Sequence, residues 1–156
     1  SLFEGFVRST AGARGLMQII PSTGASIAKS MGWPVDFDPD DLYRPYVSIR
    51  LGSRYLDSNR DSLDGDLYAA LAAYNAGPHR VTRWLPEKTL PADIWIELVP
   101  FSETRGYLRR VLAYMVIYEK RMGKDPTRLA ERMHPVPPDV EQIRSVQAGK
   151  PVASAS

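Results

Sequence analysis

The chain lacks cysteine, so it can form neither a disulfide nor a thiolate metal site. It has only two histidines, too few for a histidine-rich metal site, and we expect neither a metal nor any other cofactor. No apolar run approaches the roughly 18 residues that a membrane-spanning helix needs, and the N-terminus lacks the pattern of a signal peptide. These absences exclude zinc and thiol chemistry and leave the cellular compartment open.

The chain also has little excess of positive over negative charge. The net charge is +2, and lysine and arginine are spread along the 156 residues rather than clustered. This pattern gives no nucleic-acid footprint, so we expect no nucleic-acid partner. The mild basicity would suit an anionic polymer without requiring one. A chain of this length fits one domain that buries roughly two-thirds of its unfolded surface.

Strand-like alternation of useful length is missing too, which predicts an all-α domain of six or seven short helices. We expect Ser102 to cap the last helix and Gly123 to end it. Proline-rich loops between short helices favour orthogonal packing with a groove, and we divide the chain into a domain over 1–123 and a tail over 124–156 with little packed core. The expected helices lie at 22–32, about 46–60, 67–74, a short segment from Pro78, 92–99 and 102–122, with a loop at 33–46.

Residues 9–21 form the most unusual stretch, in which small residues crowd together before a short apolar run. Gly12 and Gly15 would let backbone approach backbone or a ligand closely. Gln18 stands between apolar neighbours, and a buried amide without partners costs roughly 1–3 kcal/mol. Either Gln18 is a satisfied core residue in a tight helix contact, or a ligand supplies its partners.

Two further stretches carry polar side chains that could bind a ligand. Tyr74 and Asn75 place a phenol and an amide at the end of a buried, alanine-rich helix. Alternatively, Tyr74 belongs to the core and Asn75 only caps the helix. Glu103 and Arg105 flank the start of the last helix, with Tyr107 one turn on, and this pair could equally form a surface salt bridge. The three tryptophans and eight tyrosines could line a sugar-binding groove or simply fill the core.

Three motifs together resemble a known family. Residues 12–23 read Gly-Ala-Arg-Gly-Leu-Met-Gln-Ile-Ile-Pro-Ser-Thr, residues 72–78 read Ala-Ala-Tyr-Asn-Ala-Gly-Pro, and residues 100–107 read Pro-Phe-Ser-Glu-Thr-Arg-Gly-Tyr. In this order and spacing they look like the catalytic domain of soluble lytic transglycosylases, over about residues 1–123. The resemblance implies a goose-type, lysozyme-like α-domain. It also implies cleavage of peptidoglycan between N-acetylmuramic acid and N-acetylglucosamine, which leaves a 1,6-anhydromuramyl end.

The resemblance further implies a mechanism with one carboxyl group. A glutamic acid that an apolar setting keeps protonated acts first as acid and then as base, and the substrate's N-acetyl group replaces a second carboxylate. In the family this glutamate precedes the serine that Ser1 matches, so we expect the sequence to be truncated just after the acid and to lack the first helix. Glu4 is the only carboxylate nearby, but it falls where the family carries a non-catalytic polar residue.

The other site residues carry over one at a time. Ser9 resembles the serine near the reacting sugar, and Tyr74 resembles the tyrosine that orients the acid and the N-acetyl group. Gln18 resembles the glutamine of the groove, with Met17 beside it as a further substrate contact, while Asn75 supports the turn or the sugar. On the muropeptide side of the cleft the resemblance implies Glu103, Arg105 and Tyr107.

The resemblance also implies a location and partners. We expect a periplasmic or cell-envelope monomer that binds peptidoglycan glycan strands and muropeptides, with a helical domain of the same protein preceding it. Three alternatives stay open: a lysozyme-type muramidase, a non-catalytic peptidoglycan-binding module, and a helical domain that binds a protein partner.

Overall fold

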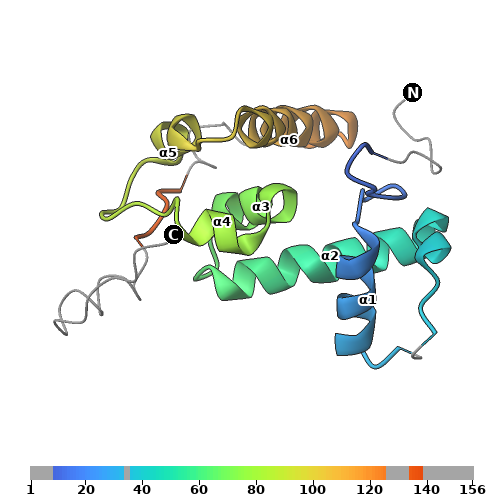
Figure 1. Cartoon of the computed structure of the whole chain (residues 1–156). Helices are drawn as coiled ribbons and strands as arrows, with labels where there is room; N and C mark the ends of the chain where they lie inside the picture. Colours follow the sequence, from blue (N-terminus) through green and yellow to red (C-terminus); the bar gives the residue numbers. More distant parts are fainter. Residues whose placement is uncertain (1–8, 34–35, 126–133, 139–156) are drawn as a thin grey trace, which may run out of the picture. The chain divides into compact units, whose positions relative to one another are not determined.

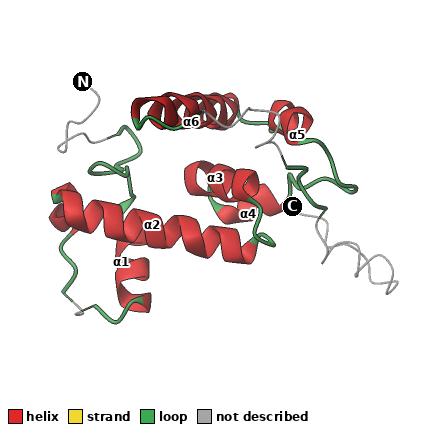
Figure 2. Cartoon of the chain, turned by 180° about the vertical axis from the view of Figure 1, so that it is seen from behind, coloured by secondary structure: helices red, strands yellow, loops and turns green. Residues whose placement is uncertain are grey.

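The structure is a computed structural model that describes residues 9–33, 36–125 and 134–138. Within these ranges it contains helices and loops and no β-strand, so the predicted all-α class is confirmed (Figure 2). In chain order the helices are α1 (Pro21–Ser30), the 3-10 helix η1 (Pro39–Tyr43), α2 (Pro45–Ser62), α3 (Leu67–Ala76), α4 (Pro78–Thr82), α5 (Ala92–Leu98) and α6 (Ser102–Arg121) (Figure 1).

The chain divides into two compact units, Ser1–Ser58 and Asn59–Ser156, and α2 runs through the boundary. Each unit is described by itself below. All the predicted helices are present, and their ends fall close to the expected positions because proline and glycine mark them. Proline stands at the first helical position of α1 and α4, where its missing N–H costs nothing.

The predicted loop at 33–46 is wrong in part, because it contains η1. Pro39 starts this helix, and the Asp38 side chain caps it by accepting a hydrogen bond from the Asp40 backbone N–H at 2.9 Å. The prolines and aspartates of this segment are therefore the residues that start a short 3-10 turn.

The predicted cap of α6 is also wrong. Ser102 is the first residue of the helix, the capping position belongs to Phe101, and no side chain caps this end. The serine lies one position too far along the chain to serve as the cap. The predicted end is confirmed, because Gly123 follows the helix with a φ of +71°.

In the first unit, α1, η1 and α2 enclose a small apolar core with the end of the 9–20 loop. Gly15 has a φ of +72° and lies so close to η1 that a Cβ atom there would stand 1.8 Å from the Leu42 carbonyl oxygen. The close backbone approach predicted for this glycine is confirmed. Gly52 of α2 also marks a close contact, with the Met17 side chain of the loop. The buried members of this core are Ile19, Ile27, Ala28, Leu42 and Leu51.

In the second unit, α3 is buried on nearly all sides, as its alanine-rich sequence predicts. It contacts α4 and α6, and α5 also contacts α6. Asp66 caps α3, since its Oδ1 accepts a hydrogen bond from the Ala69 N–H at 2.6 Å. Trp95 of α5 is buried, and its indole N–H donates to the Trp84 carbonyl oxygen at 2.8 Å.

A short piece of the C-terminal tail adds to this core. Val136 is fully buried and exchanges two backbone hydrogen bonds with Leu90, at 3.1 and 2.8 Å. Val136 is therefore a packed core residue within the segment beyond residue 123, for which little packed core is predicted. The rest of the tail, from 126 to 133 and from 139 onward, lies outside the described residues.

Candidate functional site

The loop 9–20 of the first unit carries three of the predicted site residues. Ser9 anchors the start of the loop, because its hydroxyl accepts a hydrogen bond from the Ala13 N–H at 3.0 Å and its own N–H donates to the Ala13 carbonyl at 3.0 Å. Further along, the backbones of Arg14 and Ile19 exchange hydrogen bonds of 2.9 and 3.1 Å. The four residues between them form a tight, fixed turn.

Gln18 occupies the last position of this turn, and it is exposed. Its φ is +49°, in the left-handed region that non-glycine residues rarely adopt. Its backbone N–H and its side-chain Nε2 both donate to the Gly15 carbonyl oxygen, at 3.1 and 2.8 Å. The alternative that Gln18 is a satisfied core residue in a tight helix contact is therefore wrong, because the left-handed turn carries its side chain to the surface.

Met17, beside Gln18, is half-buried, and its side chain packs against the core of the first unit. Its backbone N–H donates to the Ser48 hydroxyl at 3.0 Å, and Ser48 is fully buried in α2. Arg14 ties the loop to η1 as well, through an ion pair of 2.6 Å with Asp40 and a guanidinium 5.8 Å from the ring centre of Tyr43. No sequence pattern indicates a role for Ser48, and for Arg14 the one such signal is its position between two glycines.

The end of α3 in the second unit carries the next pair. Tyr74 is half-buried and Asn75 is exposed, and the chain turns away at Gly77 with a φ of +89°. The alternative that Asn75 only caps the helix is wrong, because Gly77 holds the capping position and its N–H donates to the Ala73 carbonyl at 2.8 Å. The Asn75 side chain instead accepts a hydrogen bond of 2.8 Å from the hydroxyl of Thr104 in α6.

Aromatic contacts join the same two motifs a second time. The Arg80 guanidinium lies 5.5 Å from the ring centre of Phe101, and its Nη1 donates to the Ala76 carbonyl at 2.8 Å. The ring of Phe101 also meets Trp84 edge to face, with 5.0 Å between the ring centres. Residues 72–80 and 100–104, far apart in the sequence, are thus neighbours within the second unit.

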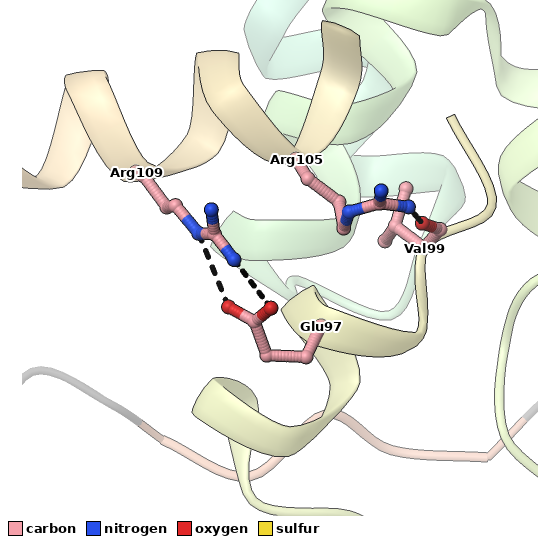
Figure 3. A network of polar contacts seen from close by, with 4 residues as sticks. All are labelled: Glu97, Val99, Arg105 and Arg109. Atoms are coloured by element: carbon pink, nitrogen blue, oxygen red, sulfur yellow. Dashed lines mark hydrogen bonds and ion pairs between the residues drawn. The ribbon is translucent and has the colours of Figure 1, made fainter. Parts of the chain in front are cut away.

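The start of α6 holds the three residues predicted on the muropeptide side. Arg105 turns toward the chain before the helix and donates to the Val99 carbonyl at 2.5 Å (Figure 3). Among the described residues no ion pair joins it to Glu103, which is exposed, so the surface salt bridge considered for these two is not formed. Burial raises the pKa of Tyr107 above its ordinary value, which keeps the phenol protonated as a hydrogen-bond donor.

A pair between Glu97 and Arg109 connects α5 to α6 one turn further along (Figure 3). Two nitrogens of the Arg109 guanidinium donate to the carboxylate of Glu97. Nε donates to Oε1 at 3.1 Å, and Nη2 donates to Oε2. The hydrogen bond from Arg109 lowers the pKa of Glu97, so this exposed carboxyl group stays ionised and cannot serve as a proton donor at neutral pH.

A proton donor for acid catalysis needs a raised pKa, and Asp66 is a described carboxyl group whose pKa is raised. Burial raises the pKa of Asp66 against the opposing hydrogen bonds from the Ala69 and Tyr68 N–H groups. Its oxygen already serves as the cap of α3. Glu4 and Ser1 lie outside the described residues.

Comparison with known families decides which protein class this arrangement belongs to. Residues 1–94 match the Transglycosylase SLT domain, and residues 98–127 match the soluble lytic transglycosylase helical domain. The chain belongs to the lytic transglycosylase family. The soluble lytic murein transglycosylase of Escherichia coli K12 is 41% identical over 123 residues, which are 78% of this chain and 19% of that protein. Membrane-bound lytic murein transglycosylase D of the same strain is 31% identical over 86% of this chain and 31% of its own length.

Solved lytic transglycosylases have the same fold. An inactive glutamate-to-glutamine mutant of Pseudomonas aeruginosa Slt matches with a TM-score of 0.73 and 42% identity, over 81% of this chain and 21% of that one. The 70 kDa soluble lytic transglycosylase of E. coli matches with a TM-score of 0.72 and 38% identity, over the same shares of the two chains. This transglycosylase domain thus spans about a fifth of the length of those relatives, and the lysozyme-like fold implied by the three motifs is confirmed.

The transglycosylase domain holds its predicted site residues in two groups. Ser9, Met17 and Gln18 lie on the loop 9–20 of the first unit. Within the second unit the Asn75–Thr104 hydrogen bond joins the end of α3 to the start of α6. In the part of the chain that the structure describes, no helix is long and apolar enough to cross a membrane, and no cluster of side chains could hold a metal ion.

Proposed function

We propose that this domain acts on peptidoglycan as a lytic transglycosylase, cleaving the bond between N-acetylmuramic acid and N-acetylglucosamine and leaving a 1,6-anhydromuramyl end. The observation that carries the proposal is the 41% identity to the soluble lytic murein transglycosylase of E. coli over 123 residues. Because murein is the substrate named for that relative, we also propose a periplasmic or cell-envelope location and muropeptides as ligands.

The proposed chemistry needs one acid and an internal nucleophile. A protonated glutamic acid gives its proton to the glycosidic oxygen, and the bond from that oxygen to C1 of the muramyl sugar breaks. The sugar's own 6-hydroxyl then forms a bond to C1, and the glutamate takes the hydroxyl proton. The glutamate-to-glutamine change in the inactive P. aeruginosa relative supports a requirement for such a group. In this protein we assign the role to a glutamate immediately before Ser1.

The described residues would bind and orient the sugars in this reaction. We assign the half-buried Tyr74 to orienting the acid and the substrate's N-acetyl group, and Ser9 to a supporting hydrogen bond near the reacting sugar. The exposed amide of Gln18 and the neighbouring Met17 would contact the glycan, as would Asn75 at the end of α3. The peptide side of a muropeptide would meet Glu103, Arg105 and Tyr107.

The test is to extend the chain before Ser1 with an N-terminal segment that ends in glutamate, and to analyse the fragments released from purified sacculi by mass spectrometry. We expect anhydro products, which are lighter by one water than hydrolytic ones. The matched control carries glutamine in place of the added glutamate and should release nothing. Hydrated reducing ends would instead identify a lysozyme-type muramidase and contradict the transglycosylase reaction.

A second candidate is a peptidoglycan-binding module without catalysis, for the chain as its sequence stands. The observation in its favour is that Glu97 is held ionised and Asp66 is used as a helix cap, which removes both from acid catalysis. The chain of 156 residues should then sediment with sacculi and release no soluble fragment. Failure to sediment would contradict glycan binding and favour a helical domain that binds a protein partner.

A further inference from the structure

Thr104 is a buried polar residue to which the motif chemistry assigns no role. It lies in the first turn of α6 and is 1% exposed. A buried hydroxyl needs a hydrogen-bond partner, and a threonine in a helix commonly finds one in the backbone carbonyl one turn earlier. Here the hydroxyl donates instead to Asn75 Oδ1 at 2.8 Å, on a different helix and 29 residues away. The side chain therefore acts on another element rather than on its own.

The direction of this hydrogen bond fixes the orientation of the Asn75 amide. An asparagine side chain has an oxygen that accepts and an NH₂ group that donates, and a half-turn about its last bond exchanges the two. The Thr104 hydroxyl engages Oδ1, which leaves the NH₂ group as the part of the exposed Asn75 side chain that Thr104 does not bind. An amide held this way suits a ligand group that accepts hydrogen bonds.

The backbone under Asn75 is held by other contacts. The Gly77 N–H donates to the Ala73 carbonyl at 2.8 Å, and Arg80 donates to the Ala76 carbonyl at 2.8 Å. Loss of the Thr104 hydroxyl would thus leave the helix end in place and release only the amide. This separation makes the role of the hydroxyl accessible to experiment.

We propose that Thr104 is a positioning residue that holds the Asn75 amide with its NH₂ group toward the substrate, so that the end of α3 selects an oxygen acceptor on the glycan. The acetamido carbonyl of an N-acetylated sugar is the acceptor that fits. The inference rests on the proposed function, because it names the chemical group that the proposed glycan site selects.

The first test replaces the donor and keeps the acceptor. In Asn75→Asp the carboxylate still accepts the hydrogen bond from Thr104, but the NH₂ group is gone. We expect the affinity for a GlcNAc–MurNAc tetrapeptide, measured by calorimetry at pH 7, to fall about tenfold, with little change in melting temperature. Unchanged affinity would mean that the oxygen faces the ligand, and it would overturn the proposal.

The second test changes the positioning residue itself. Thr104→Val keeps the shape and removes the hydroxyl, and it should weaken binding of the same muropeptide about three- to tenfold. Thr104→Ser restores the hydroxyl and should bind within about twofold of the unmodified chain. Thr82→Val is the matched control, because that hydroxyl donates to the His79 carbonyl at 3.1 Å in an exposed position. Equal affinities for the valine and serine variants at 104 would show that Thr104 only fills space, which overturns the proposal.

A readout without ligand separates this inference from the proposed function. Nuclear Overhauser effects between the side-chain NH₂ protons of Asn75 and the Thr104 side chain should be weak in the unmodified chain. The reason is that Asn75 Oδ1 faces Thr104 and the NH₂ group lies farther from it. Strong effects would show the amide turned over and would contradict the inference. If the orientation is as proposed but the unmodified chain binds no muropeptide, the proposed function fails and the glycan acceptor fails with it.

Discussion

Gln18 combines an unfavourable backbone conformation with an exposed side chain. A left-handed φ costs a non-glycine residue about 1–2 kcal/mol, and Gln18 keeps it at +49°. The two hydrogen bonds to the Gly15 carbonyl oxygen offset part of this cost. Strain of this kind persists where neighbouring contacts enforce it, and it is frequent at binding sites. The glutamine side chain is thus held at the surface by its hydrogen bond to Gly15 and is not buried in the core.

Two substitutions at this position separate strain from binding. Gln18→Ala should weaken muropeptide binding several-fold and lower the free energy of unfolding by only about 0.5–1 kcal/mol, because an exposed hydrogen bond is lost. Gln18→Gly should weaken binding equally but leave stability unchanged or raise it, since glycine adopts the left-handed conformation freely. Calorimetric titration and urea unfolding measure the two effects. A large loss of stability in the glycine variant would contradict the exposed position of the side chain.

Asp66 caps α3, but its burial disfavours the charged form of its carboxyl group. Its folded-state pKa is raised from near 3.8, so the folded chain keeps the proton over a pH range in which the unfolded chain has lost it. The contribution of Asp66 to stability therefore decreases as the pH rises from below 3.8 through the raised pKa.

The prediction compares two variants at Asp66. Asp66→Asn keeps an oxygen for the Ala69 N–H and cannot ionise, so its stability relative to the unmodified chain should improve between pH 3 and pH 7. Asp66→Ala removes the cap and should cost about 0.5–2 kcal/mol in this pH range. Melting temperatures measured across the range test both. A difference between the asparagine variant and the unmodified chain that does not change with pH would contradict the raised pKa.

At the scale of elements, the loop 9–20 keeps its shape because it packs against η1 and α2. Gly15 permits the approach to Leu42, Gly52 accommodates Met17, and Ser48 receives the Met17 N–H. Each of these contacts joins residues distant in sequence. These contacts fix the position of the loop against η1 and α2, although the loop contains no helix.

Two glycines with nearly the same backbone angle test this contact. Gly15→Ala should lower the free energy of unfolding by about 3 kcal/mol or more, because a Cβ atom would meet the Leu42 carbonyl oxygen at 1.8 Å in addition to the left-handed strain. Gly32→Ala carries a similar φ of +71° with no atom within 4 Å, so it should cost only about 1–2 kcal/mol. Urea unfolding measures the difference, and equal losses would show that η1 does not constrain the loop.

At the scale of the whole molecule, segments far apart in the sequence complete each unit. In the second unit Val136 is buried, and its backbone pairs with Leu90, which lies 46 residues earlier in the sequence. The core of this unit thus extends beyond the last helix, and the division into a domain over 1–123 and a tail over 124–156 stays a prediction.

Val136→Ala tests this extension of the core. It removes about two buried carbon groups and should lower the free energy of unfolding by about 2 kcal/mol, with a lower melting temperature. Thr89→Ala, at an exposed position beside Leu90, is the control and should change stability by less than about 0.5 kcal/mol. If both variants melt together with the unmodified chain, residues 134–138 do not contribute to the core.

Much of the fold could be predicted from local patterns. The alanine-rich run of α3 is apolar on every side, so its burial follows from composition alone, and Pro78 and Gly123 mark a helix start and a helix end by their own geometry. The errors arose where two local rules competed. Proline usually interrupts regular structure, but Pro39 stands at the first position of a 3-10 helix, where it is favoured. Serine is a common helix cap, but Ser102 is already the first residue of α6.

By itself the sequence determined the α-helices, the absence of thiol chemistry and the family, because these depend on residue types, on their spacing and on three motifs in order. Only the tertiary structure decided that Gln18 is exposed, that Arg105 turns to Val99, and that Thr104 orients the Asn75 amide. Each of these depends on which atom of a distant segment lies within hydrogen-bond distance or on which way a turn directs a side chain. Spacing along the chain carries no such information until the chain is folded.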